Sequence, residues 1–171
     1  MQIYAIEAMV GRKLGLKQRS GSGMENLSGK LQLPEDICEW VSPKTLLSWV
    51  REEIDKPNGT PGNGFPKPVL AVLAFAYCRG IYDSEEILRV CDSVPEFQTL
   101  SSGSVSNVEQ LRTARHKKLV LLINVTVRLL TRAVCEHCKL APEELSPELK
   151  RRVHENSVQR IDNAILIDRM V

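Results

Sequence analysis

The sequence predicts an all-α protein, a compact multi-helix bundle with a central apolar helix, a tight helical corner and a long basic helix. Apolar residues recur at helical spacing, and no segment shows the strict alternation of a half-buried strand. Aromatic residues make up only 5% of the chain, against 43% hydrophobic residues in total. This balance is typical of a helical core of Leu, Val, Ile and Ala rather than of a packed sheet.

The chain divides by composition into three parts. Residues 1–23 carry a weak helical pattern that ends in Arg-Ser-Gly-Ser-Gly, the composition of a flexible linker. We therefore expect residues 1–23 to be a flexible N-terminal extension that adds little to the fold. Residues 24–139 form the predicted helical domain, and residues 140–171 supply a C-terminal helix that begins at Ser146 and Pro147.

The first firm helix signal in the domain is Ser42 followed by Pro43, an N-cap residue and a proline suited to the first helical position. A short helical turn is predicted before it, at residues 34–40. The stretch 55–66 is rich in Pro, Gly and Asn, which predicts an exposed loop after this helix.

Residues 67–79 are almost wholly apolar, which predicts the central buried helix. Gly80 ends this helix, because glycine adopts a left-handed conformation without steric cost. Asp83, with Glu86 three residues later, matches a capping box and starts the next helix. In a DNA groove that next helix would present three acids and only one base to the phosphates, so we assign it to the scaffold. The acids are Glu85, Glu86 and Asp92, and the base is Arg89.

A short helical turn at 95–100 and a serine-rich loop lead to the long basic helix. Ser106 or Asn107 caps this helix, and it extends to Lys139, either straight or with a kink. Its longest apolar run is far shorter than a bilayer requires, and the N-terminal residues lack the order of a signal peptide. We therefore expect a cytoplasmic protein with no membrane contact.

Charge distribution singles out the long helix. The chain carries a net charge of +2, but residues 106–139 hold seven basic and two acidic residues, whereas residues 24–105 hold seven basic and twelve acidic ones. Such a basic stripe can bind nucleic-acid phosphates, or it can pair with the acidic helices of its own chain. The candidate phosphate contacts are Arg112, Arg115, Lys117 and Lys118; Arg128 and Arg132, one helical turn apart, are further candidates for phosphate or for a partner interface.

The five cysteines indicate buried thiols in a reducing compartment rather than a disulfide framework. Cys135 and Cys138 have the Cys-x-x-Cys spacing of half a zinc site, but a second pair is missing from the sequence. On a helix, two residues at this spacing also share one face, as core residues do. We expect neither a metal nor another cofactor.

Residues 65–130 carry an ordered set of short signals that resembles a known family. A proline precedes an apolar helix, a Gly-Ile-x-x-Ser corner follows, and a basic Leu-Arg-x-x-x-His segment comes last. The family is the small helical N-terminal domain of bacterial insertion-sequence transposases with an Asp-Asp-Glu catalytic triad. The matching residues are Pro66 or Pro68, Leu70, Leu73, Ala76, Tyr77, Gly80, Ile81, Ser84, Glu86, Ile87, Cys91, Asp92, Phe97, Leu100, Gly103 and the segment 111–119.

The resemblance implies a non-catalytic module that acts in DNA transposition. The family's Pro-Asp-His-Ser-Thr before the last helix reads Ser-Val-Ser-Asn-Val here, and its Phe-Arg reads Leu111-Arg112. Residues after Lys139 are too few for the ribonuclease H-like catalytic domain, so we expect no enzyme and no catalytic residue. The implied partners are transposon-end DNA, a second copy of the chain, or a transposase catalytic subunit.

Two other function classes fit the residues. A helical protein-interaction module without nucleic-acid binding would use the apolar faces of the long helix or the last helix. An enzyme would have to rely on Cys135, Cys138 or His116, none of which lies in a pattern that activates it.

Overall fold

The computed structural model describes residues 31–56 and 66–170. These residues form seven α-helices and two short 3-10 helices and contain no strand, which confirms the all-α prediction. The predicted extension 1–23 and most of the predicted loop 55–66 lie outside the described residues. No helix in the described ranges has the length and apolar character to cross a membrane.

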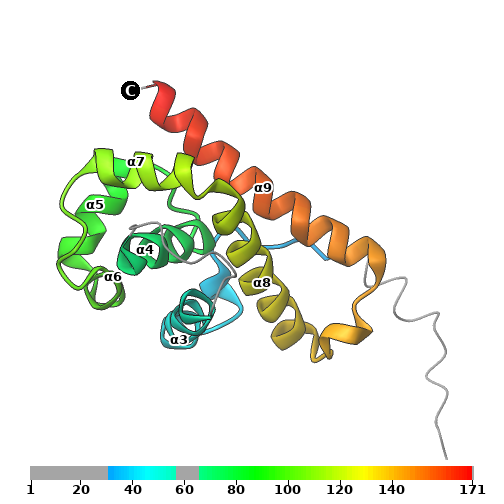
Figure 1. The fold of residues 1–171 in the computed structure, drawn as a ribbon. Helices are drawn as coiled ribbons and strands as arrows, with labels where there is room; N and C mark the ends of the chain where they lie inside the picture. Colours follow the sequence, from blue (N-terminus) through cyan, green and yellow to red (C-terminus); the bar gives the residue numbers. More distant parts are fainter. Residues whose placement is uncertain (1–30, 57–65, 171) are drawn as a thin grey trace, which may run out of the picture. The chain divides into compact units, whose positions relative to one another are not determined.

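Each helix predicted within the described residues has a counterpart (Figure 1). The 3-10 helices, η1 and η2, precede α3 and α9 respectively. The elements in chain order are η1 (Ile37–Glu39), α3 (Pro43–Asp55), α4 (Lys67–Cys78), α5 (Ser84–Ser93), α6 (Pro95–Ser101), α7 (Val108–Lys117), α8 (Leu119–Cys138), η2 (Pro142–Glu144) and α9 (Pro147–Met170).

Helix α4 is the core of the unit formed by residues 32–171. Every residue from Val69 to Cys78 is buried, and α3, α5, α6, α7 and α8 all pack against this helix. Phe75 meets Phe97 of α6 edge to face, with 5.0 Å between ring centroids. The apolar run that predicted a central helix is therefore apolar on every side because it has neighbours on every side.

The chain leaves α4 through the predicted glycine stop. Gly80 has φ +72°, and the backbone N–H of Ile81 bonds the carbonyl of Ala76, as in a left-handed helix end. Asp83 then caps α5 as predicted, but its side chain accepts from the backbone N–H of Glu85 rather than from that of Glu86, so the bond formed is not the one of the predicted capping box.

Replacing Gly80 by alanine is expected to lower the free energy of unfolding by about 2 kcal/mol. The left-handed φ is unfavourable for alanine, and its Cβ would lie 2.6 Å from Cγ and 3.2 Å from the carbonyl oxygen of Glu35. Gly103 is the matched control, because it has φ +71° but no atom within 4 Å of its added Cβ. Urea unfolding of both variants checks this, and equal losses would contradict the role of the Glu35 contact.

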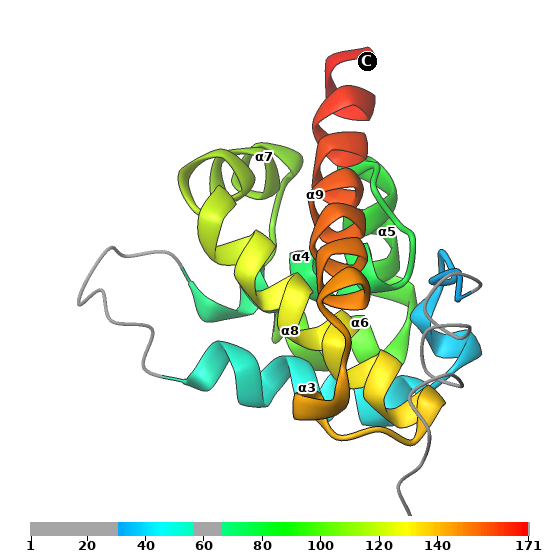
Figure 2. The same cartoon turned by 90° about the vertical axis from the view of Figure 1, so that its right-hand side faces the viewer.

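The long basic helix is two helices. Lys118 has φ −120° and ψ 25°, which ends α7 and starts α8 in a new direction. Asn107 caps α7 by accepting from the backbone N–H of Gln110, and Ser146 caps α9 through the N–H of Leu149. Helix α9 packs along α8, and its C-terminal end lies between α5 and α7 (Figure 2).

Candidate functional site

The six predicted phosphate contacts lie on α7, on α8 and at the junction between them. The structure does not present them as one basic face. Arg115 is buried, while Arg112, Arg128 and Arg132 are each about one-third exposed and pair with carboxylates from other helices. These pairs form two clusters, one at α9 and one at α3.

Arg115 is the centre of the first cluster, and its side chain is only 1% exposed. Its Nε donates to the hydroxyl oxygen of Tyr77 at 2.5 Å, and its Nη2 donates to Oγ of Ser84 at 3.0 Å. Its Nη1 donates to the carboxylate of Asp168. Arg115 therefore joins α4, α5, α7 and α9, and it has no surface with which to contact DNA. This buried position does not suit the predicted contact of Arg115 with the phosphates of DNA.

The carboxylate of Asp168 is held from three sides. The hydroxyl of Ser84 donates to it at 2.8 Å and the backbone N–H of Ser84 at 3.3 Å, while Arg115 and Arg112 supply positive charge. Arg112 Nε lies 3.5 Å from Asp168 Oδ2 and is a buried donor with no hydrogen-bond partner among the described residues.

The environment sets the protonation of this cluster. Burial alone would raise the pKa of Asp168, but the Ser84 hydrogen bond and the Arg115 charge outweigh it and hold the pKa below its ordinary value. Burial raises the pKa of Tyr77 to about 12, so its hydroxyl stays neutral. Burial alone would lower the pKa of Arg115, but its contacts with Tyr77 and Asp168 have the larger, opposite effect and raise the pKa above its ordinary value. The guanidinium therefore remains charged.

Glu53 is the centre of the second cluster, and its side chain is 2% exposed. Arg128 Nε donates to its carboxylate at 2.6 Å. Lys56, the residue that follows α3, donates to the same carboxylate from Nζ, also at 2.6 Å. Arg132 lies 3.4 Å from Glu53 and also covers the ring of Trp49, 4.7 Å from its centroid. These pairs join α3 to α8, as expected if the basic stripe pairs with acidic helices of its own chain.

Both acidic partners occupy core positions in their helices, a signal that could have identified them. Glu53 stands seven residues after Leu46 and three after Val50, and Asp168 stands seven after Ile161. All three of these apolar residues are buried. A charged residue on the apolar face of a helix is expected to have a buried partner.

The exposed basic residues of the predicted phosphate-binding stripe lie at the α7–α8 junction. His116 and Lys117 are exposed and Lys118 is half-buried, next to Val120, whose side chain is 71% exposed. Arg112 borders them on the preceding turn of α7. The predicted phosphate-binding stripe is thus reduced to this junction.

Cys135 and Cys138 lie half-buried in the last turn of α8. Burial raises the pKa of both thiols, which favours the protonated, less reactive form. His137 points elsewhere and stacks on Trp40, with 4.2 Å between ring centroids. Among the described residues, no group of three or more His, Cys, Asp or Glu side chains is placed to hold a metal ion.

Comparison of the chain with protein-family models, with curated proteins and with solved structures gives no match. The resemblance of residues 65–130 to transposase N-terminal domains therefore remains a prediction based on their motifs. The described residues form a helical scaffold in which two clusters of ion pairs hold neighbouring helices together. The basic α7–α8 junction and the end of α9 lie at its surface.

Acid is expected to destabilise the fold through Asp168 and Glu53. Hydrogen bonds and positive neighbours outweigh burial and lower the pKa of both carboxyls from their ordinary values of 3.8 and 4.5. A lowered folded-state pKa gives stability that is present above the ordinary value and is lost as the pH falls through the folded-state value. Urea unfolding between pH 7 and pH 3 should therefore show a decline that begins near pH 4.5. An Asp168→Asn/Glu53→Gln variant should show a shallower decline, and an unchanged one would contradict this assignment.

Proposed function

We propose that the chain is a non-catalytic assembly module of the transposase type, which pairs with a second copy through the C-terminal end of α9. The observation that carries this proposal is the pairing of the arginines. Four of the six predicted contacts form ion pairs with carboxylates of the same chain: Arg112, Arg115, Arg128 and Arg132. That charge is then largely unavailable to DNA, whereas the end of α9 carries apolar side chains in solvent.

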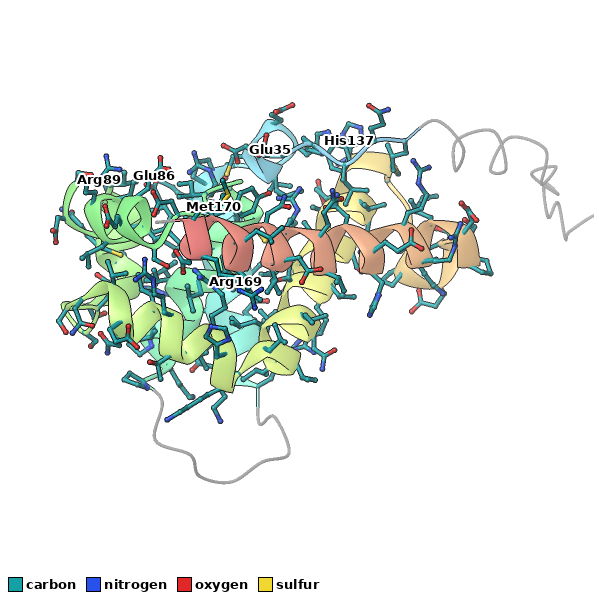
Figure 3. The ribbon with its side chains drawn as sticks, turned by 90° about the horizontal axis from the view of Figure 1, so that it is seen from above. Glu35, Glu86, Arg89, His137, Arg169 and Met170 are labelled. Carbon is teal, nitrogen blue, oxygen red and sulfur yellow. The ribbon has the colours of Figure 1, made fainter. Side chains whose placement is uncertain are left out.

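The outer face of α9 supports self-pairing. Leu166 is 55% exposed and Met170 is 86% exposed, and they are one helical turn apart. Asp162 and Arg169, both exposed and seven residues apart, share this outer side with Leu166. Figure 3 looks onto α9 and shows Arg169 and Met170 near its end.

The order of these residues favours an antiparallel pair of identical helices. A two-fold axis near Leu166 brings Leu166 against its own copy and Asp162 against the partner's Arg169. The same contact is repeated by symmetry, so the dimer contains two Asp162–Arg169 pairs. Only about three helical turns take part, so we expect a weak dimer that depends on concentration.

Sedimentation equilibrium over a range of protein concentrations tests this proposal. Leu166→Glu should abolish the dimer, because it buries two carboxylates against each other at the axis. Asp162→Arg and Arg169→Asp should each weaken association, and the double variant Asp162→Arg/Arg169→Asp should restore it, because the charges then match again.

Arg151→Glu is the matched control, since Arg151 is exposed on α9 but far from the proposed contact. It should leave the dimer intact. A wild-type chain that stays monomeric at all concentrations would exclude self-pairing. Failure of the double charge reversal to recover association would exclude the antiparallel arrangement.

DNA contact at the α7–α8 junction is a second candidate function. It is favoured by the exposure of His116 and Lys117 beside Arg112 and Lys118. Titration onto duplex DNA at two salt concentrations tests it, with Lys117→Gln/Lys118→Gln as the variant. Affinity that falls with salt and with this variant would support the role, while no affinity at low salt would exclude it.

A further inference from the structure

The environment of Asp168 has the composition of an anion-binding site. It combines two guanidinium groups from α7, a serine hydroxyl, and the backbone N–H of the first residue of α5. Helix N-termini and arginines are the groups that proteins use to bind phosphate and sulfate. Here the anion is supplied by the chain itself, by Asp168 in the last turn of α9.

One donor of the site makes no hydrogen bond to the carboxylate. Arg115 and both donors of Ser84 bond the two oxygens of Asp168, and the buried Nε of Arg112, 3.5 Å from Oδ2, is left without a partner. A buried donor without a partner is unfavourable and uncommon. A tetrahedral anion has a further oxygen that this donor could bond.

The charges lead to the same ligand class. Arg112 and Arg115 bring two positive charges, and Asp168 brings one negative charge. Asp83, the N-cap residue of α5, accepts the backbone N–H of Glu85. A phosphate dianion would therefore balance the two arginines more completely than Asp168 does.

The C-terminal end of α9, which carries Asp168, has few buried side chains to hold it against α5 and α7. Leu166 and Met170, on either side of Asp168 in the sequence, are exposed, and Ile165 and Ile167 are only half-buried. Ala164 is the last buried residue of the helix. The final turn and a half is thus held mainly by Asp168 itself.

We infer that Ser84, Arg112 and Arg115 form a latent oxyanion site, which Asp168 closes and which takes a free phosphate or a phosphate monoester when the end of α9 detaches. Arg115 is too deeply buried to reach the phosphodiester of a DNA duplex. The site therefore differs from the DNA contact proposed for the α7–α8 junction, with which it shares Arg112 alone. Binding at the site and release of the α9 end are one equilibrium, so phosphate is expected to oppose pairing through α9.

An Asp168→Ala variant tests the site by emptying it. In phosphate-free buffer at pH 7 it should melt at a lower temperature than the wild type. Inorganic phosphate, titrated at constant ionic strength, should raise its melting temperature saturably. Adding Arg112→Met to this variant should weaken phosphate binding about tenfold or more, since a charge-assisted hydrogen bond is lost.

Phosphate also stabilises proteins without binding to a site, so the wild type and Asp162→Ala serve as controls. Asp162 lies on the exposed side of the same helix. A gain in Asp168→Ala no larger than in these controls would overturn the proposal. If Asp168→Ala is unfolded without phosphate, phosphate should refold it; Asp168→Asn, the milder variant, should show a smaller gain, and no gain in either overturns the proposal.

Glycerol 3-phosphate in a parallel titration distinguishes the two sources of the ligand. Stabilisation by both compounds assigns the site to phosphate monoesters, and stabilisation by inorganic phosphate alone assigns it to the free ion. The titrations use dilute monomeric protein, so their outcome does not depend on whether the chain pairs through α9.

Discussion

Replacing Arg115 by methionine is expected to lower the free energy of unfolding by about 3–5 kcal/mol, because it leaves a buried carboxylate without its counterion. The side chains of Arg115 and Asp168 are 1% and 8% exposed, so water cannot substitute for the lost charge. Tyr77 and Ser84 lose a hydrogen-bond donor in the same change. Urea unfolding at pH 7, read by circular dichroism, measures the loss.

Arg112→Met is the matched control for this effect. Arg112 lies one turn earlier on α7 and faces the same carboxylate, but its side chain is 32% exposed and its contact with Asp168 is 3.5 Å long. We expect a loss below about 1 kcal/mol. Similar losses in the two variants would contradict the central role given to Arg115.

A double variant separates the cost of the uncompensated charge from that of the lost packing. Replacing Arg115 by methionine and Asp168 by leucine removes both charges and puts an apolar side chain in the place of each charged one. Buried ion pairs replaced in this way are often as stable as the original. The double variant should therefore be more stable than Arg115→Met alone, and a further loss would show that the network stabilises the fold through its hydrogen bonds.

The helix boundaries could be predicted because their signals are local. Ser42, Asn107 and Ser146 each cap a helix with a side chain that accepts the backbone N–H three residues on. Gly80 ends α4 for an equally local reason. The break at Lys118 has no such signal: no glycine or proline is present, and the apolar pattern runs through the junction. Its position depends on how α8 packs against α4 and α9.

The candidate site could be predicted only in part, because its partners are distant in the sequence. Charge counts singled out residues 106–139, which form α7 and α8, as the basic segment. They could not show that Arg115 meets Asp168, 53 residues away, or that Arg128 meets Glu53, 75 residues away. A basic stripe facing solvent and one facing an acidic helix have the same pattern, and only the packing of the helices distinguishes them. For that reason the charge asymmetry describes helix pairing here more than it describes a DNA surface.

Arg160 is the second buried arginine that we expect to contribute strongly to the stability of the fold. Its guanidinium bonds backbone carbonyl groups instead of a carboxylate. Its side chain lies on the inner face of α9, and the residue is 3% exposed. Nη1 donates to the carbonyl oxygens of Glu35 at 2.6 Å and Tyr77 at 2.7 Å, and Nη2 donates to that of Pro34. The Tyr77 carbonyl belongs to the last turn of α4, where the helix dipole is negative and favours a cation.

Arg160→Met should therefore cost about 3 kcal/mol, because three carbonyl acceptors lose a charged donor in a buried place. The loss should also be local in character. Amide hydrogen exchange should become faster in residues 32–40, which Arg160 fastens to the end of α4, while α3 and α8 keep their protection. Arg151→Met, an exposed change on the same helix, should leave both stability and exchange unchanged. Uniform loss of protection throughout the described helices would mean that Arg160 supports the whole core rather than this one attachment.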